Sequence, residues 1–360
     1  MSRRVFAAFV GIATLSLAEG LARLLPPPSA AAGAWRQQDA APEGILLDGS
    51  PWFLWELSPG THREFGVSVS INSVGLRGPE PGEKSRPRVM AVGDSSIYGF
   101  GVADSEVFTA RLGAPLQADV INAGVPGYST FQTLNLLDAR ALALEPDLLL
   151  IGNLWSDNSF DTFVDRDLLA AYTGWTLSPT QRVRSVLERS SGFRWLDWGL
   201  RVRGHAVEAT RVGWTVGRGG DPMGKRRVGI EDYAANLDAM VERLRDRGGS
   251  VVFVLLANRE DILHGEPLPA WEPYRSVMRE TAARWGAPTV DVPAAFVASG
   301  LDVDALFLDL MHPSAVGHQL LAEAVLSTLG GWPQTPIVLR APSPRPVYSD
   351  PFIQREAPSK

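Results

Sequence analysis

Residues 89–101 read VMAVGDSSIYGFG, an apolar run that leads directly into Gly93-Asp94-Ser95-Ser96. A continuously hydrophobic run of this length is typical of a parallel strand that is buried on both faces. The polar turn after it has two explanations. Either the chain needs small, turn-forming residues there, or the turn presents Ser95 as a nucleophile at the carboxyl end of the strand.

The same pattern recurs along the chain and indicates the fold class. Short apolar runs end in small or polar residues at 87–93, 118–124, 146–153, 250–258 and 287–292. Helical patterns cover 128–144, 231–247 and 314–329, and the second places Leu237, Met240, Val241 and Leu244 on one face. Alternating strands and helices predict an α/β fold with a doubly wound, central parallel sheet. In such a sheet the functional groups gather at the carboxyl ends of the strands.

The N-terminal segment predicts export. Arg3 and Arg4 precede an apolar run at 5–18, which reaches about 20 residues, the length of a membrane span, when it is counted through Leu25. We therefore expect a signal peptide or membrane-anchor helix at 1–25. The protein would then face the periplasm or the exterior, and it would be secreted if the segment is cleaved. A buried helix of the main domain is the alternative.

Composition divides the remaining chain into a linker, one large domain and a tail. Small and Pro/Ala-rich residues predict a linker at 26–50, followed by the main domain at 51–332. The Pro-rich residues 333–360 are predicted to be disordered. Alternation in VSVSIN, at 67–72, predicts a short strand or hairpin that packs on the main domain.

One interval, residues 158–230, interrupts the alternation because it contains no convincing strand. It is rich in basic residues and carries the tryptophans Trp175, Trp195, Trp198 and Trp214. Two interpretations remain open. The interval is a helical surface insertion around its own small core, or a lid over the strand ends that contacts membrane or substrate.

Bulk composition excludes several classes of function. The net charge is −6, so the chain lacks the basic footprint of a nucleic-acid-binding protein. The absence of cysteine excludes disulfides, thiolate metal sites and a cysteine nucleophile. The five histidines are scattered, and we predict neither a metal site nor any other cofactor.

A second polar cluster, FLDLMHP, stands at 307–313. Its Asp309 and His312 are spaced so that the carboxylate can accept the Nδ1 proton of the imidazole. The other ring nitrogen is then free to take the proton of the Ser95 hydroxyl. An Asp/His pair that only caps the following helix is the alternative. His318, one turn into that helix, is expected to pack or hydrogen-bond there.

The end of the second predicted strand, INAGVPGYS at 121–129, supplies a third candidate. Acyl transfer needs at least two hydrogen-bond donors where the oxyanion develops, and each is worth about a hundredfold to a thousandfold in rate. Gly124 has no Cβ, so its N–H can come close to a substrate oxygen. A plain turn is the alternative, because Asn-Ala-Gly and Pro-Gly also favour one.

These clusters together resemble the SGNH (GDSL) hydrolase family. Its first, second and last sequence blocks resemble Gly93-Asp94-Ser95-Ser96, Asn122-Ala123-Gly124 and Asp309-Leu310-Met311-His312. The resemblance places Ser95 at the nucleophile and the Gly124 N–H at an oxyanion donor. It covers about 66–330 and implies a flavodoxin-like, three-layer α/β/α fold with metal-free serine esterase or acyl-transfer chemistry.

The third block departs from the family pattern G-x-N-D, in which the Asn side chain is an oxyanion donor. Counting from the start of the strand places Ser156 where the family has this Asn. The Ser156 hydroxyl and the Asn158 amide rank equally as the third donor. Asn153 ranks behind them because it still lies in the predicted strand. The N–H groups of Ser95 and Gly124 complete the expected oxyanion site.

The sequence therefore predicts an exported, membrane-anchored serine esterase whose triad is Ser95, His312 and Asp309. Its substrate is expected to be a small ester or an O-acylated glycan with a short acyl group such as acetyl. Two alternatives remain open. The protein is an O-acyltransferase that acts on an extracytoplasmic polysaccharide, or a non-catalytic domain that binds a glycan or a partner.

Overall fold

A five-stranded parallel sheet forms the centre of the protein. The computed structural model describes residues 11, 14–21, 47–50, 53–161, 164–173, 225–264, 271–335 and 337–348. The strand order is β11-β10-β7-β5-β6. These strands are β5 (Arg88–Gly93), β6 (Asp119–Gly124), β7 (Leu148–Gly152), β10 (Ser250–Leu255) and β11 (Thr289–Asp291). They match the five apolar runs, so the predicted α/β fold with a central parallel sheet is confirmed.

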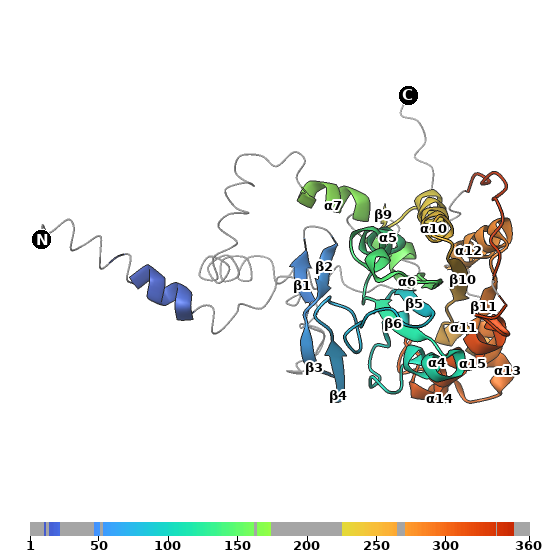
Figure 1. The fold of residues 1–360 in the computed structure, drawn as a ribbon, viewed down its shortest axis with the longest axis horizontal. Helices are drawn as coiled ribbons and strands as arrows, with labels where there is room; N and C mark the ends of the chain where they lie inside the picture. The colour runs from blue at the N-terminus through green and yellow to red at the C-terminus, as the bar shows by residue number, and fades with distance from the viewer. Residues whose placement is uncertain are drawn as a thin grey trace, which may run out of the picture.

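Helices cover both faces of this sheet (Figure 1). One layer contains α5 (Thr130–Ala139), α10 (Ile230–Arg245) and α12 (Glu272–Trp285), and the other contains α4 (Phe108–Leu116), α13 (Val292–Ser299) and α15 (Ala315–Leu329). Shorter helices are α3 (Ser95–Tyr98), η1 (Ala141–Leu144), α6 (Trp155–Asn158), α11 (Arg259–His264) and α14 (Val303–Leu306). All three predicted helical segments are present, but the segment predicted as one helix over 128–144 divides at Arg140 into α5 and the 3-10 helix η1. The predicted apolar face of α10 is buried.

The strand register brings three loops to one edge of the sheet. Gly93, the last residue of β5, pairs with Gly124 of β6 on one side and with Gly152 of β7 on the other. The chain therefore leaves these three strands at the same level. Parallel strands place their carboxyl ends together, so side chains from 94–98, 125–129 and 153–158 can meet there.

Two antiparallel hairpins precede the sheet. One pairs β3 (Gly60–Glu64) with β4 (Val67–Ile71), and its Ser70 N–H donates to the Asp104 carboxylate at 2.9 Å. The predicted hairpin packed on the main domain is thus confirmed. The other pairs β1 (Leu47–Ser50) with β2 (Leu54–Leu57). This hairpin begins inside the predicted linker 26–50, so the linker is shorter than predicted. Leu47 is buried and belongs to the core.

The Pro-rich tail also differs from its prediction. Residues 337–348 form no helix or strand, yet they lie along the domain. The Arg340 N–H donates to the Trp285 carbonyl at 2.7 Å, and Ile337 packs against the core. The prediction of disorder for 333–360 was wrong for this part, because proline disfavours regular hydrogen bonding without preventing side-chain packing.

The interval that interrupts the sheet pattern contains a short antiparallel pair. Here β8 (Phe160–Asp161) pairs with β9 (Lys225–Arg226), and α7 (Asp165–Thr173) follows β8. The expectation of no strand in 158–230 was wrong for these four residues, whose two-residue runs are too short to show a pattern. The four tryptophans of this interval lie outside the described residues, so its role as insertion or lid stays a prediction.

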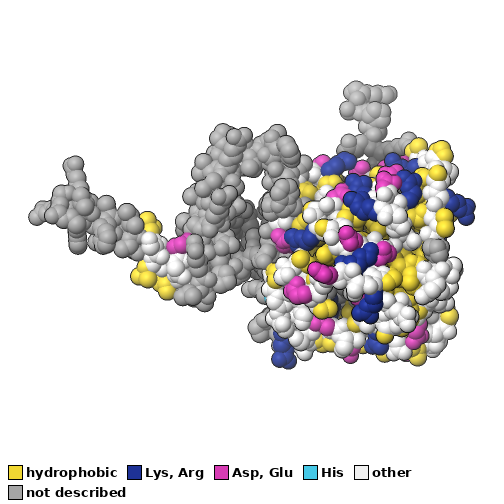
Figure 2. Space-filling model, in the orientation of Figure 1, with side chains coloured by type: hydrophobic (Ala, Val, Ile, Leu, Met, Phe, Trp, Pro, Cys, Tyr) yellow, Lys and Arg dark blue, Asp and Glu magenta, His cyan; other side chains and the backbone are white. Residues whose placement is uncertain are grey.

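The N-terminal segment is described only at residue 11 and at the helical residues 14–21. In the described part of the chain, no helix is both long enough and apolar enough to cross a membrane. The anchor at 1–25 stays a prediction. Figure 2 shows that Lys and Arg side chains are mixed with Asp and Glu on the described surface of the face it presents.

Candidate active site

The nucleophile candidate stands where β5 turns into α3. A Cβ on Gly93 would lie 2.1 Å from the Gly152 carbonyl oxygen, so only glycine fits at this strand end. The Asp94 side chain then caps α3 by accepting the Ser96 N–H at 3.0 Å. Ser95 is therefore the first residue of a short helix at the carboxyl edge of the sheet, as the sequence pattern predicts.

The structure brings Ser95, His312 and Asp309 into one hydrogen-bonded chain. The Nε2 atom of His312 lies 2.8 Å from Ser95 Oγ, and its Nδ1 atom lies 2.6 Å from Asp309 Oδ2. A neutral imidazole with its proton on Nδ1 satisfies both bonds, because it donates to the carboxylate and accepts from the hydroxyl. Ser95 and His312 are buried, whereas the Asp309 side chain is 48% exposed. The arrangement is that of a Ser-His-Asp triad.

Local hydrogen bonds keep Asp309 ionised. Burial acts to raise the pKa of this carboxyl, but the hydrogen bond and charge of His312 outweigh it and hold the pKa below its usual range. The second carboxylate oxygen accepts the N–H groups of Met311 (2.9 Å) and His312 (2.8 Å). These bonds hold the carboxylate in position beside the imidazole and favour its charged form.

Residues to which the sequence analysis assigned no role of their own support the triad. The second carboxylate oxygen of Asp94 accepts the N–H groups of Leu154 (3.3 Å) and Trp155 (3.1 Å), which fastens the start of α6 beside α3. The Trp155 indole N–H donates to Ser96 Oγ, and Ser96 Oγ donates to the Met311 carbonyl, each at 3.0 Å. Asp94 and Ser96 stand in the quoted motif, but nothing in the sequence signals contacts across 59 to 215 residues.

Gly124 does not occupy the predicted role. Its N–H donates to Asn122 Oδ1 at 3.0 Å, so it is not available to a substrate oxygen. A Cβ at this position would lie 2.5 Å from the Tyr98 backbone nitrogen. Glycine is needed here because the backbone of α3 packs against it. The prediction of Gly124 as an oxyanion donor is therefore corrected.

Gly127, three residues after Gly124, has a backbone N–H that the sequence analysis did not consider as a donor. The carbonyl of Pro126 accepts the Trp55 indole N–H at 3.0 Å, and that of Gly127 accepts Arg227 at 2.9 Å. In a planar trans peptide the N–H points away from the carbonyl, so the Gly127 N–H points away from Trp55. No acceptor for it lies among the described residues. The Pro-Gly dipeptide and the Gly127 φ of +78° were the available signals.

The three candidates for the side-chain donor are separated by their contacts. Asn153 is committed elsewhere, because its amide donates to Thr133 Oγ1 at 3.0 Å. Ser156 follows Trp155, whose N–H bonds Asp94, and its hydroxyl has no hydrogen-bond partner within the described residues. Asn158 lies at the other end of α6, where its carbonyl accepts a hydrogen bond from Arg226. Its buried amide nitrogen has no partner in the described structure.

The remaining expectations concern structural groups. His318 is fully buried, with its Nδ1 atom 3.4 Å from the Phe108 N–H and its ring parallel to that of Phe108, as predicted for a packing role. Burial lowers the pKa of His318 to about 3, so the ring stays neutral. Within the described residues, no group of three or more acidic or histidine side chains is placed to hold a metal ion.

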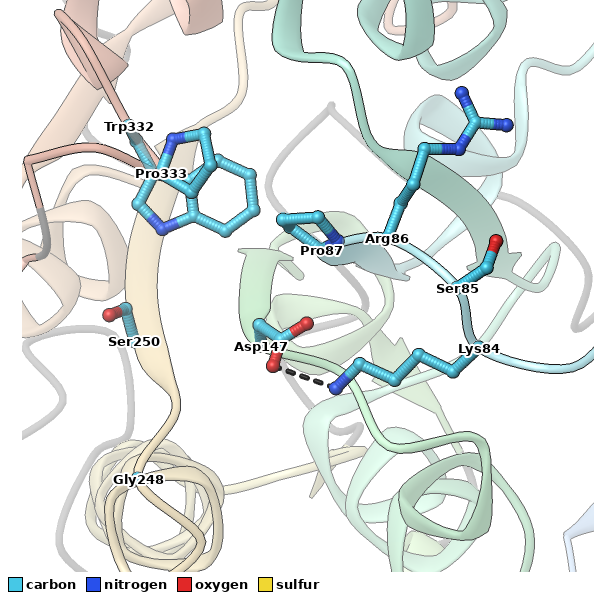
Figure 3. A pocket seen from close by; sticks show the side chains of 9 residues that line it. All are labelled: Lys84, Ser85, Arg86, Pro87, Asp147, Gly248, Ser250, Trp332 and Pro333. Carbon is cyan, nitrogen blue, oxygen red and sulfur yellow. Dashed lines mark hydrogen bonds and ion pairs between the residues drawn. The ribbon is translucent and has the colours of Figure 1, made fainter.

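A hollow of about 540 Å³ lies at the opposite edge of the sheet (Figure 3). It opens beside the amino ends of β5, β7 and β10 and is lined by Lys84, Ser85, Arg86, Pro87, Asp147, Gly248, Ser250, Trp332 and Pro333. Lys84 and Asp147 form an ion pair across it at 2.7 Å. The triad stands at the carboxyl ends of the strands, so this hollow is not part of the candidate active site.

The fold and the site together define an α/β protein with a Ser-His-Asp arrangement on a parallel sheet. A family model, described as GDSL-like Lipase/Acylhydrolase family, matches residues 172–320. Over these residues the chain is similar to the GDSL-like lipase/acylhydrolase (SGNH) family, the family that its sequence blocks resemble. It includes Asp309 and His312 and begins after Ser95.

Several solved structures are similar to the chain at low identity. An alpha/beta hydrolase enzyme from the metagenome of Lake Arreo is 18% identical, with a TM-score of 0.44 over 70% of this chain and 98% of that one. An acetylxylan esterase from Geobacillus stearothermophilus is 17% identical (TM-score 0.44; 69% and 95%). The lipase/acylhydrolase from Enterococcus faecalis is 18% identical (TM-score 0.42; 68% and 95%). No curated protein matches the sequence.

Proposed function

We propose that this protein is a serine ester hydrolase in which Ser95 is the nucleophile, His312 the general base and then general acid, and Asp309 the residue that orients His312. One observation carries the proposal. A buried Ser95 hydroxyl lies 2.8 Å from the imidazole nitrogen, whose partner nitrogen lies 2.6 Å from a carboxylate. A serine hydroxyl is a weak nucleophile, and this arrangement is what activates it.

The reaction follows from these contacts. His312 Nε2 takes the proton as Ser95 Oγ bonds to the ester carbon, and the resulting imidazolium is stabilised by Asp309. His312 then returns the proton to the alcohol oxygen as the ester C–O bond breaks. Water repeats the two steps on the acyl-enzyme and releases the acid. The donors proposed for the oxyanion are the N–H groups of Ser95 and Gly127 and the hydroxyl of Ser156.

The finer assignment concerns the substrate and the location. We infer an ester with a short acyl group, such as an O-acetylated glycan or a small acetate ester, hydrolysed outside the cytoplasm. The basic residues ahead of the apolar run at 5–18 support export. Leu15, Leu17 and Leu21 are more than half exposed in the described part of this segment, which supports its burial in a lipid phase.

Covalent labelling tests the proposal before any substrate is known. Residues 34–360 would be purified and treated with a fluorophosphonate, and the modified peptide would be found by mass spectrometry. We expect an adduct on Ser95 that disappears in His312→Ala, together with hydrolysis of p-nitrophenyl acetate that disappears in Ser95→Ala. Replacement of the exposed Ser73 by alanine serves as the control and should change neither signal. Hydrolysis that survives Ser95→Ala would refute the assignment.

A further inference from the structure

Phe65 occupies a position where folding alone favours another residue. It forms, with Gly66, the two-residue turn between β3 and β4, and both have positive φ, +48° and +85°. Turns of this kind favour Asn or Gly at the first position, since a bulky side chain is strained in the left-handed region. The Phe65 side chain is also 51% exposed, so burial offsets little of that strain. A strained, exposed phenylalanine points to a function.

The ring of Phe65 extends a row of contacting rings that begins at the catalytic histidine. Phe100 lies against the His312 ring, with centroids 4.3 Å apart and planes 25° apart. Phe65 lies against Phe100, with centroids 4.7 Å apart. The Phe100 N–H also donates to the Ser95 carbonyl at 3.1 Å, which ties this ring to the nucleophile's own helix. Phe65 and Phe100 are called here the aromatic wall. They form a continuous apolar surface from the buried His312 ring to the half-exposed Phe65 ring.

The hairpin tip is held rigidly against the nucleophile helix. Glu64, next to Phe65, is buried and accepts the Tyr98 hydroxyl at 2.5 Å, and Tyr98 is the last residue of α3. Ser70 of the same hairpin bonds Asp104 at 2.9 Å. The part of the hairpin that carries Phe65 is therefore anchored to the domain without a substrate, which lowers the cost of ordering a binding surface.

The chemistry of the triad determines which part of the ester can meet the wall. His312 Nε2 must deliver its proton to the oxygen of the departing alcohol, so this oxygen lies within hydrogen-bonding distance of the ring that Phe100 covers. On the neighbouring loop, the half-exposed Leu308 adds a second apolar surface. Its side chain lies over Gly101, and its N–H donates to the His312 carbonyl at 2.9 Å.

We propose that the aromatic wall is the alcohol subsite of this enzyme and that it selects esters whose alcohol carries a flat apolar face. This inference rests on the proposed esterase function. Aromatic faces bind flat rings by stacking and edge contacts that an alkyl alcohol cannot make equally well. Phe65 is then a specificity-determining residue, contributed by a hairpin that precedes the parallel sheet in the chain.

Two acetate esters with different alcohols test the subsite. The ratio of kcat/KM for benzyl acetate to that for ethyl acetate would be measured for the native chain and for Phe65→Asn. Asparagine suits the turn, so this variant should unfold at the same temperature as the native protein or a higher one. We expect the ratio to fall about threefold to tenfold. Phe65→Tyr should restore it, and the distant exposed Leu263→Ser should leave it unchanged.

The outcomes separate this inference from the function on which it rests. An unchanged ratio in Phe65→Asn, or an equal loss with both esters, would overturn the alcohol subsite while Ser95-dependent hydrolysis stands. If the native protein hydrolyses neither ester and Ser95 takes no fluorophosphonate, the esterase assignment fails and the subsite fails with it.

Discussion

At the scale of single residues, Ser156 and Asn158 are the two candidates for the side-chain donor of the proposed oxyanion site. Ser156 and Asn158 both have unpaired polar atoms in the described structure, but they stand at different ends of α6. Only the start of α6 is fastened to Asp94, and through it to the helix of Ser95. The contacts therefore favour Ser156, which is also the residue at the expected position in the sequence.

Replacing Ser156 by alanine should lower kcat for p-nitrophenyl acetate by about tenfold to a hundredfold, with a smaller change in KM. The reason is that an oxyanion donor acts on the charge that develops in the transition state. The matched variant Asn158→Ala should change kcat by less than about threefold. Steady-state kinetics on the two folded variants distinguishes the two candidate donors. A large loss of kcat in Asn158→Ala alone would assign the donor to the Asn158 amide instead.

The contrast between Ser95 and Gly124 shows how far sequence reasoning reaches at this scale. Ser95, Asp309 and His312 could be selected because strand ends meet at one edge and because a three-residue spacing joins an acid to a histidine. The role of Gly124 could not be read in this way. An N–H direction depends on which acceptor lies nearest, and the Asn122 side chain two residues earlier takes that bond.

At the scale of elements, the β3–β4 hairpin depends on a buried carboxyl group. Burial is the largest influence on Glu64 and raises its pKa to about 7, although the Tyr98 hydroxyl and the charge of Arg77 act to lower it, and Asp104 raises it further. One carboxyl oxygen of Glu64 has no partner within the described structure. The hairpin was predicted from its alternating pattern, but nothing in that pattern shows that Glu64 points inward.

The variant Glu64→Gln should remove the pH dependence that this carboxyl group gives to the free energy of unfolding. The folded state holds the Glu64 proton up to about pH 7, whereas the unfolded chain releases it near pH 4.5. The carboxyl therefore destabilises the native fold as pH rises between these values. The free energy of unfolding of the variant minus that of the native protein should therefore increase by about 2 kcal/mol from pH 5.5 to pH 8.5.

Urea unfolding at the two pH values measures this difference. Glutamine keeps an acceptor for the Tyr98 hydroxyl, so the comparison isolates the charge. The exposed Glu83→Gln serves as the control, and its difference from the native protein should not depend on pH. A Glu64→Gln difference that is constant across this range would show that the carboxyl does not titrate there.

At the scale of the whole molecule, the order of strands and helices was accessible from the sequence, whereas the placement of its polar interior was not. Hydrophobic runs repeat with the fold and therefore predict it. Buried acids such as Asp157 do not repeat. Burial raises the Asp157 pKa to about 8 against the opposing hydrogen bonds from Thr130, and that burial follows only from the packing of α5 against α6.

These buried groups predict that the free energy of unfolding is larger at mildly acidic pH than at alkaline pH. Burial raises the pKa of Asp94 to about 6, that of Glu64 to about 7 and that of Asp157 to about 8, so the folded state retains protons that the unfolded chain has released. Each group therefore costs stability as pH rises toward its folded pKa. His318 acts oppositely, because its folded pKa of about 3 costs stability only as pH falls below the unfolded value of 6.5.

Above pH 6.5 the His318 contribution changes by less than about 0.5 kcal/mol, so the acids dominate the slope. The free energy of unfolding should fall by about 1 to 3 kcal/mol between pH 6.5 and 8.5, since unfolding in this range releases protons from Glu64 and Asp157. Urea denaturation at closely spaced pH values measures the slope. The folded double variant Glu64→Gln/Asp157→Asn should show little change in the free energy of unfolding over this pH range. A free energy of unfolding that stays level or rises across this range in the native protein would mean that these carboxyls are ionised in the folded state.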